Sequence, residues 1–118
     1  MIIGIGTDIV ENKRFEKSAF NRAFLKKCYS AEEIDICSKD CNIQFLAGNF
    51  AAKEAMAKAL GTGFCGFLPR DITILRDACG KPFVKFSDSI IIVQNKTVHI
   101  SISHSKDYSV AFALIEMR

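Results

Sequence analysis

Hydrophobic and polar residues follow one another along the first part of this chain in a pattern that predicts one strand followed by helices. Residues 2–10 (IIGIGTDIV) are mostly apolar and β-branched, which is typical of a strand, and Gly4 and Gly6 mark places where another group approaches its backbone closely. Two helical segments follow, a basic one first. The second is expected to begin at Ser30, which has a capping-box partner three residues later in Glu33.

The middle and the end of the chain predict a long helix and two hairpins. The helix runs from about Gln44 to Leu60, where Gly61 is expected to stop it. The segments DITILRD and KPFVKF predict one hairpin, and VHISISH and YSVAFALIE a second. Residues 87–96 predict either a short helix or a strand, because their apolar run is too brief for its period to decide. This order of elements indicates the α+β class.

The long predicted helix, in the stretch FAAKEAMAKALGTG, carries charged residues among its alanines. At about 100° of rotation per residue, Phe50, Lys58 and Gly61 fall within roughly 40° of the line through Glu54. Small and apolar residues lie opposite: Ala52, Met56 and Ala59. One face of this helix is therefore expected to pack, and the other to present charged groups.

The composition indicates one folded domain over residues 1–118. The chain has 118 residues, of which 49% are hydrophobic and 25% charged, with two prolines and no low-complexity tract or repeat. Met1 leads directly into the first strand without the basic start and long apolar run of a signal peptide, and no segment has the length of a membrane span. A cytoplasmic protein is expected.

The five cysteines do not predict a disulfide framework, because their number is odd and no export signal precedes them. Cys37 and Cys41 have a spacing compatible with a metal pair on a helix, but no second pair or nearby histidine completes a zinc site. Buried or unreactive thiols are the expected state.

Positive charge is concentrated near the start of the chain. The formal charge is +3, but residues 12–27 contain six basic residues and one acidic residue, so this segment carries +5 and the remainder −2. Arg14, Ser18 and Arg22 repeat at intervals of four, which would align them on one helical face. An acidic partner is expected there, with a merely solvated face as the alternative. Nucleic acid is not expected, because the net charge is small and no recognised binding motif is present.

Two motifs are set aside. GTGFCG matches the glycine pattern of dinucleotide folds, but it follows a helix and precedes a strand, which is the reverse of the required context. No nucleophile elbow singles out a member of a hydrolase triad.

A carboxylate pair is the remaining candidate for chemistry. Asp8 lies near the end of the first predicted strand and Glu54 lies within the long helix. Oxygen ligands suit Mg²⁺, which keeps several waters and completes its shell with substrate phosphates. Lys53 and Lys58 would neutralise phosphate charge beside such an ion. Spacing alone leaves the alternative of an ordinary surface ion pair between Glu54 and Lys58.

The chain resembles the holo-[acyl-carrier-protein] synthases of the 4'-phosphopantetheinyl transferase superfamily in three segments, which occur in the order GIGTDIVE, FAAKEAMAKALGTG and ISISHS. The similarity extends through GKP at residues 80–82, between the second and third segments. The resemblance covers nearly the whole chain. It implies an antiparallel sheet with a long helix packed on it, and a Mg²⁺-dependent transferase of fatty acid biosynthesis. The implied reaction moves the 4'-phosphopantetheine arm of coenzyme A to a serine of apo acyl carrier protein and releases adenosine 3',5'-bisphosphate.

The resemblance also implies roles for individual residues. Asp8 and Glu54 match the metal ligands, Lys58 matches a lysine that contacts the phosphates, and Arg14 matches a position that meets the acidic carrier, near Arg22. Residues at positions that line the coenzyme A pocket of the family are Gly61, His104 and Ser105. The serine proton would pass either to a water on the metal or to Glu54, and the sequence does not choose between them.

The chain departs from the family pattern at one position. Many relatives carry a basic residue just before the phenylalanine of the long helix, whereas this chain has Asn49, so one phosphate contact is missing and Lys53 is a candidate to replace it. The chain between Phe86 and Val98 is also shorter than in many relatives. Members of this short type assemble as trimers, which predicts sites between subunits.

Two other functions stay open from the residues alone. A non-catalytic adaptor could bind an acidic protein through the basic segment, with Glu54 and Lys58 only solvated. A Mg²⁺-dependent nucleotide hydrolase could use the same carboxylates with water as the nucleophile.

Overall fold

The computed structural model describes residues 1–40, 42–87 and 89–118. Its strands are β1 (Ile2–Glu11), β2 (Ile72–Arg76), β3 (Pro82–Phe86), β4 (Lys96–His104) and β5 (Tyr108–Met117). Its α-helices are α1 (Phe15–Ser18), α2 (Arg22–Cys28), α3 (Ala31–Lys39) and α4 (Ile43–Leu60). Short 3-10 helices cover Asn12–Arg14, Pro69–Asp71 and Ile91–Val93.

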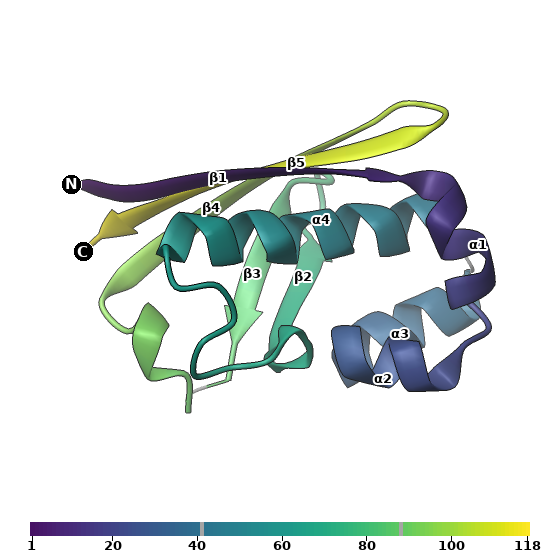
Figure 1. Cartoon of the computed structure of the whole chain (residues 1–118), viewed down its shortest axis with the longest axis horizontal. Coiled ribbons are helices and arrows are strands. Elements are labelled where there is room, and N and C mark those ends of the chain that lie inside the picture. The colour runs from purple at the N-terminus through teal and green to yellow at the C-terminus, as the bar shows by residue number, and fades with distance from the viewer. Residues whose placement is uncertain (41, 88) are drawn as a thin grey trace.

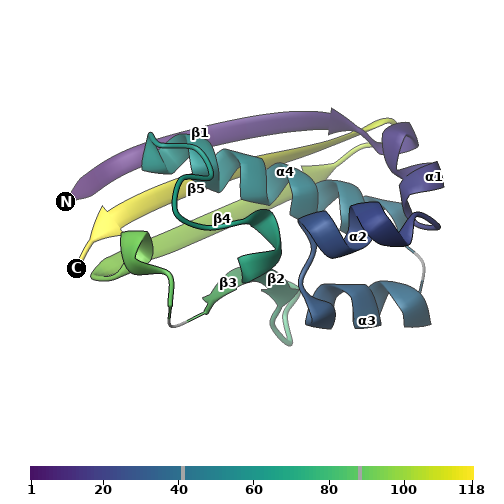
Figure 2. The ribbon, with the colours of Figure 1, turned by 60° about the horizontal axis from the view of Figure 1, so that its bottom comes forward.

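The described strands form two antiparallel sheets that pack around α4. The larger sheet has the order β1-β5-β4, and β2 pairs with β3 in a separate hairpin. Figures 1 and 2 show α4 lying along the three-stranded sheet, with the hairpin beside β4 and with α2 and α3 on the side of α4 away from β1. This enclosure explains why 11 of the 18 residues of α4 are buried. The fold is α+β, as the sequence predicts.

Small residues let α4 lie very close to β1. A Cβ placed on Gly4 would come within 1.8 Å of the carbonyl oxygen of Ala59, and one on Gly6 within 2.0 Å of that of Ala55. Only glycine fits at such a distance, because any side chain would overlap the backbone of the helix. The sequence-based expectation of a close approach at these two glycines is confirmed.

Most predicted elements agree with the structure to within one or two residues. Strand β1 extends one residue beyond the prediction, and both predicted hairpins form. Ser30 and Glu33 make the reciprocal capping box at the start of α3. Helix α4 begins one residue before Gln44, and Gly61 ends it in the left-handed conformation with φ 79°.

The basic segment does not form the continuous helical face that its spacing predicts. Arg14 closes a 3-10 turn, Ser18 ends α1, and Arg22 begins α2. The break occurs because the side chain of Asn21 accepts a hydrogen bond from the backbone of Phe24 and so caps a new helix. Arg14 and Ser18 share one helical turn, in which Ser18 Oγ donates to the carbonyl oxygen of Arg14 at 3.2 Å, but the expected continuation of this face to Arg22 is wrong.

The segment that the sequence left undecided between helix and strand is helical in part. Of residues 87–96, Ile91–Val93 form a short 3-10 helix, while residue 88 lies outside the described part of the chain.

Cys41 also lies outside the described part of the chain, so the Cys37–Cys41 pair is not described. Cys28, Cys65 and Cys79 carry free thiols. Within the described helices, none combines the length and apolar character that crossing a bilayer would require.

Candidate functional site

Asp8 and Lys58 meet at the edge of the large sheet. The Lys58 ammonium donates to the Asp8 carboxylate (Nζ to Oδ1, 3.1 Å) and to the carbonyl oxygen of Thr7 at 2.9 Å. Helical side chains slope toward the N-terminus of their helix, so Lys58 reaches back over the preceding turn to β1. The Asp8 side chain is 17% exposed and that of Lys58 is 55% exposed, so the pair is open to a ligand.

Glu54 lies in the same electrostatic environment. Partial burial raises the pKa of its carboxyl above the ordinary value, and the negative charge of Asp8 raises it further, while Lys58 and Arg14 act in the opposite direction. Two carboxylates and two cations therefore share one region of a single chain. The structure brings Asp8, Glu54 and Lys58 together, as the sequence predicts.

The donor set suits a hard divalent cation. Two carboxylates that repel each other would be stabilised by a cation between them, and Mg²⁺ binds through one or two carboxylates when substrate phosphates and waters supply the other ligands. Among the described residues, no group of three or more histidine, cysteine or acidic side chains could hold a metal. Asp8 and Glu54 are thus a pair that fits Mg²⁺ with external ligands, and not a complete protein cage.

Gly61 lies one helical turn beyond Lys58. Nothing lies within 4 Å of the position that a Cβ would take there. The end of α4 is therefore open, and a ligand held by Glu54 and Lys58 has unobstructed backbone beside it.

His104 and Ser105 lie in a second place, where β4 ends. A Cβ on Gly48 of α4 would lie 2.7 Å from Cε1 of the His104 ring, so the ring rests on the helix at this glycine. Burial lowers the pKa of His104, and the positive charge of Arg76 lowers it further. The Arg76 guanidinium donates to Oδ1 of Asn49 at 2.9 Å.

The two places are on different flanks of α4. Gly48, which carries the His104 ring, and Glu54 are six residues apart, which separates them by about 120° around the helix axis and about 9 Å along it. Asp8 belongs to β1 and His104 to β4, and these are the two outer strands of the sheet. Within one chain, the predicted site residues therefore form two separate groups: Asp8, Glu54, Lys58 and Gly61 in the first, and His104 and Ser105 in the second.

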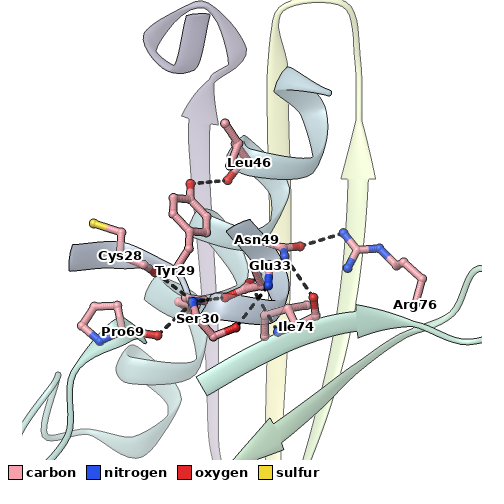
Figure 3. A network of polar contacts seen from close by, with 10 residues as sticks. Cys28, Tyr29, Ser30, Glu33, Leu46, Asn49, Pro69, Ile74 and Arg76 are labelled. Atoms are coloured by element: carbon pink, nitrogen blue, oxygen red, sulfur yellow. Dashed lines mark hydrogen bonds and ion pairs between the residues drawn. The ribbon is translucent and has the colours of Figure 1, made fainter. Parts of the chain in front are cut away.

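Lys53 belongs to neither group. Its side chain is 2% exposed and its ammonium donates to Glu33 Oε1 at 2.6 Å, to the carbonyl of Cys28 at 2.8 Å and to that of Pro69 at 2.9 Å. Figure 3 shows the surrounding network, in which Asn49 also contacts Glu33. The expectation that Lys53 contacts phosphate is wrong, because all three of its protons are used in the core.

Position 49 also differs from what the sequence suggests. Asn49 is fully buried, donates to Glu33 Oε2 at 2.7 Å and to the carbonyl of Ile74 at 3.0 Å, and accepts from Arg76. Lys53 therefore does not replace a missing cation at this position. The cation that does lie beside Asn49 is Arg76, whose guanidinium also covers the ring of Phe45 at 5.5 Å.

The two arginines of the basic segment are both exposed. The Arg14 guanidinium lies 5.7 Å from the ring centroid of Phe15 and 5.8 Å from that of Phe50. Arg22 lies on the rim of a groove of about 750 Å³ between α2 and α3, which has an apolar lining that includes Leu25 and Ile34. No residue of either group of predicted site residues lines this groove.

Sequence reasoning missed four residues that surround the second group: Asn12, Gly48, Arg76 and Ser109. Asn12 and Ser109 are joined by a hydrogen bond across 97 positions of the chain, and Arg76 reaches Asn49 across 27. No local spacing signals such contacts. Gly48 is the one of these residues that the sequence could have singled out, because a glycine inside an alanine-rich helix indicates that another group packs closely against it.

Comparisons with known proteins agree with this architecture. Residues 4–113 match the family model of the 4'-phosphopantetheinyl transferase superfamily. The chain is 45% identical over 121 residues to a holo-[acyl-carrier-protein] synthase of Clostridium beijerinckii, covering 98% of each chain. A synthase of the same name from Neisseria meningitidis has a similar crystal structure, with a TM-score of 0.88, 38% identity and 98% and 99% of the two chains covered.

A third comparison includes a ligand. The holo-(acyl-carrier-protein) synthase of Bacillus anthracis, solved in complex with coenzyme A (3',5'-ADP), matches with a TM-score of 0.86 and 37% identity, covering 100% of this chain and 99% of the other.

Proposed function

Because this chain belongs to the holo-[acyl-carrier-protein] synthases of the 4'-phosphopantetheinyl transferase superfamily, we propose that it transfers the 4'-phosphopantetheine arm of coenzyme A to a serine of apo acyl carrier protein. The observation that supports this most directly is the group of Asp8, Glu54 and Lys58 on one flank of α4. We further propose that the 118 residues act as one domain, in the cytoplasm, in support of fatty acid biosynthesis.

In this reaction the serine oxygen forms a bond to the β-phosphorus of coenzyme A, and the bond from that phosphorus to the bridging oxygen breaks. Adenosine 3',5'-bisphosphate leaves with the bridging oxygen and its electron pair. Asp8 and Glu54 would hold Mg²⁺, which, when bound, neutralises charge on the phosphate oxygens. Lys58 would turn its exposed ammonium from Asp8 to a phosphate oxygen and stabilise charge there.

The serine proton needs an acceptor. Glu54 lies half-buried beside Asp8, and the raised pKa of its carboxyl belongs to the site without Mg²⁺, whose positive charge would lower it. Either Glu54 or a solvent molecule would accept the proton, without an acyl- or phosphoryl-enzyme intermediate.

We propose that complete sites form between subunits of a homotrimer. His104 and Ser105 are separated from Glu54 within one chain, so a pocket that uses both groups needs a neighbouring copy. The outer face of the large sheet supplies a surface for such contact, because it exposes large apolar side chains on two adjacent strands. These residues are Ile3, Ile5 and Ile9 of β1 and Tyr108, Val110 and Phe112 of β5.

The neighbouring copy would also bring Arg76 into the site. Arg76 carries a positive charge beside His104 and has no carboxylate within ion-pair distance among the described residues. We propose that it supplies the phosphate contact that Asn49 cannot make.

Acyl carrier protein would dock on the basic segment 12–27, which carries +5. Arg14 is exposed and its charge acts on Glu54, so a carrier bound there lies close to the proposed catalytic group. Arg22 and the apolar groove beside it would extend this surface along α2.

One experiment tests the proposed function against its rivals. The protein is incubated with coenzyme A, Mg²⁺ and apo acyl carrier protein, and the carrier is weighed by mass spectrometry. A mass gain equal to one phosphopantetheine supports the transferase. A non-catalytic adaptor binds the carrier without any gain, and a nucleotide hydrolase releases adenosine bisphosphate without the carrier.

Variants assign the reaction to the proposed residues. Glu54→Gln and Asp8→Asn are each expected to lower turnover more than tenfold, because loss of a metal ligand removes several kcal/mol of transition-state stabilisation. Lys58→Met should lower kcat more than it changes the KM for the carrier. Glu32→Gln, an exposed acid of α3 outside the proposed site and outside the basic segment, is the matched control and should stay near wild type.

A further inference from the structure

Arg76, the last residue of β2, has no ion-pair partner in the part of the chain that the structure describes. Two groups there accept protons from its guanidinium, namely Oδ1 of Asn49 at 2.9 Å and the carbonyl oxygen of Leu75 at 3.5 Å. A guanidinium has five N–H groups, so about three of them are left for a ligand. Burial lowers the pKa of Arg76, while the negative charge of Glu33 raises it in part. A poorly solvated cation of this kind favours an anionic ligand.

Asn49 fixes the direction of this guanidinium. The Asn49 nitrogen donates to Oε2 of Glu33 at 2.7 Å and to the carbonyl oxygen of Ile74 at 3.0 Å. A carboxylate and a carbonyl can only accept, so the amide cannot be turned over, and its Oδ1 must face Arg76. Asn49 is fully buried, so water does not compete for these contacts. Figure 3 shows Asn49 between Glu33 and Arg76.

Phe45 restricts the Arg76 side chain from a second side. The ring centroid of Phe45 lies 5.5 Å from the guanidinium carbon, and Phe45 precedes Asn49 by about one turn of α4. Two neighbouring residues of one helix thus hold the guanidinium while its remaining N–H groups stay unoccupied. A neutral amide does this without cancelling the positive charge, which an aspartate at position 49 would do.

The location of Arg76 indicates which phosphate of coenzyme A it meets. In the proposed reaction a bond of the diphosphate breaks, so the diphosphate lies at Asp8, Glu54 and Lys58. Arg76 belongs to the other flank of α4, where its charge acts on His104. Coenzyme A has one further phosphate, the 3'-phosphomonoester of its ribose, which takes no part in the bond breaking. This is the phosphate that remains for Arg76.

We infer that Asn49 is a positioning residue that aims Arg76 at the 3'-phosphate of coenzyme A, and that this pair makes the protein select coenzyme A over 3'-dephospho-coenzyme A. Asn49 acts through Arg76 and does not itself touch the ligand. The inference rests on the proposed use of coenzyme A, and it gives the buried amide of Asn49 a part in substrate selection.

Calorimetric titration of the full-length protein with each ligand tests this selection without the carrier. The wild type should bind coenzyme A at least about tenfold more tightly than 3'-dephospho-coenzyme A, a ratio typical of one charge-assisted hydrogen bond. Arg76→Met should lower this ratio about fivefold or more, with little change in the affinity for 3'-dephospho-coenzyme A. Lys85→Met removes a positive charge from the other strand of the same hairpin and should keep the wild-type ratio. A wild-type ratio in Arg76→Met would overturn the inference.

Variants at position 49 separate positioning from a merely structural role. Asn49→Ala should lower the ratio about three- to tenfold although Arg76 is still present, because the guanidinium loses the acceptor that directs it. In the Arg76→Met protein, the same substitution should not change the ratio further. Loss of packing alone would weaken the binding of both ligands equally. That result, or additive losses in the double variant, would refute the role of Asn49.

Nitrogen-15 NMR of the wild type keeps the inference testable if Asn49→Ala does not fold. The chain has five arginines, and the spectrum of Arg76→Lys identifies the Nε signal of Arg76. This signal and the side-chain amide signals of Asn49 should move on saturation with coenzyme A and respond much less to 3'-dephospho-coenzyme A. Equal responses to the two ligands would contradict the inference alone. A wild type that binds neither ligand would overturn the proposed function and this inference together.

Discussion

Lys53 illustrates how a charged residue can be misassigned when only its neighbours in sequence are known. Next to Glu54 and Lys58 it reads as part of the charged face, but the structure turns its side chain by about 100° from Glu54 and into the core. Its partner Glu33 comes from α3, which no spacing within α4 can indicate. An ion pair between two helices that are distant along the chain, such as Lys53 with Glu33, could not be predicted from the sequence.

The burial of Lys53 leads to a stability prediction. Lys53→Met should lower the free energy of unfolding by about 3–5 kcal/mol, because it leaves the Glu33 carboxylate buried without its counter-charge. Urea unfolding measures this change. Lys53→Met/Glu33→Leu should recover part of the loss, since the pair is then replaced by apolar groups. A Lys53→Met protein of wild-type stability but low activity would return Lys53 to the catalytic site.

Tyr29 makes stability sensitive to alkali. Burial raises the pKa of its phenol, whose hydroxyl donates to the carbonyl of Leu46 at 2.7 Å. The unfolded tyrosine loses its proton above about pH 10 while the folded one keeps it, so this contribution is complete below that pH and is lost as pH rises. Each further pH unit should cost about 1.4 kcal/mol.

Unfolding in urea at about pH 9 and about pH 11, on either side of the tyrosine pKa, measures this loss. The fall in stability between the two should be smaller in Tyr29→Phe, which has no phenolic proton but retains every other alkaline group. An identical fall in both proteins would show that Tyr29 is not the group responsible.

At the scale of elements, the contact between α4 and β1 sets the position of the catalytic group. Gly6 lies against the backbone of Ala55, and Asp8 follows two residues later on the same face of the strand. Gly6→Ala should destabilise the protein by about 3 kcal/mol, since the new methyl group would meet helix backbone and not a movable side chain.

Gly63→Ala is the matched control for this change. Gly63 has a positive φ of 64° but open space around it, so its substitution should cost only about 1 kcal/mol. Thermal or urea unfolding of the two variants gives the comparison. Similar losses would mean that α4 and β1 are less closely packed than the structure describes.

The basic segment shows what charge periodicity can and cannot predict. The excess of positive charge is real, but Asn21 divides the segment, so Arg14 and Arg22 lie on separate elements at different angles. Periodicity within α4 and alternation within the hairpins located those elements well, because each rests on one dominant buried face. A short segment with few buried residues has no such constraint, and one capping side chain decides its path.

Because the two arginines lie on separate elements, the single substitution Arg14→Glu should be enough to weaken docking of the carrier. A second substitution at Arg22 is not needed. The KM for acyl carrier protein should rise several-fold, and the KM for coenzyme A should change little. Wild-type KM for the carrier should also rise with salt more steeply than that of the variant, because exposed charges act over about 10 Å at 0.1 M salt. Lys81→Glu, an equal charge change in an exposed turn, is the control. Equal salt dependence in all three proteins would move the docking surface elsewhere.

At the scale of the whole molecule, the division of the site residues between two flanks of α4 predicts how inactive variants combine. Glu54→Gln and His104→Leu damage different groups. Co-assembled in equal amounts as trimers, they should regain about a quarter of wild-type activity, because about one site in four then combines an intact residue from each chain. Asp8→Asn mixed with Glu54→Gln should stay inactive, since both residues belong to the same group of one chain. Recovery in neither mixture, despite proven mixed trimers, would place the complete site within one chain.

The Glu33 carboxylate has a consequence for how the molecule can come apart. One oxygen closes the start of α3 at Ser30 and binds Lys53, and the other binds Asn49 and reaches the backbone of Ile74 at 3.4 Å. Helices α3 and α4 and strand β2 thus share one acceptor. Separating any one of them from the others would leave buried polar partners without hydrogen bonds, so local opening here carries an added free-energy cost. Loss of this one carboxylate, as in Glu33→Gln, should therefore make all three elements more sensitive to limited proteolysis under native conditions.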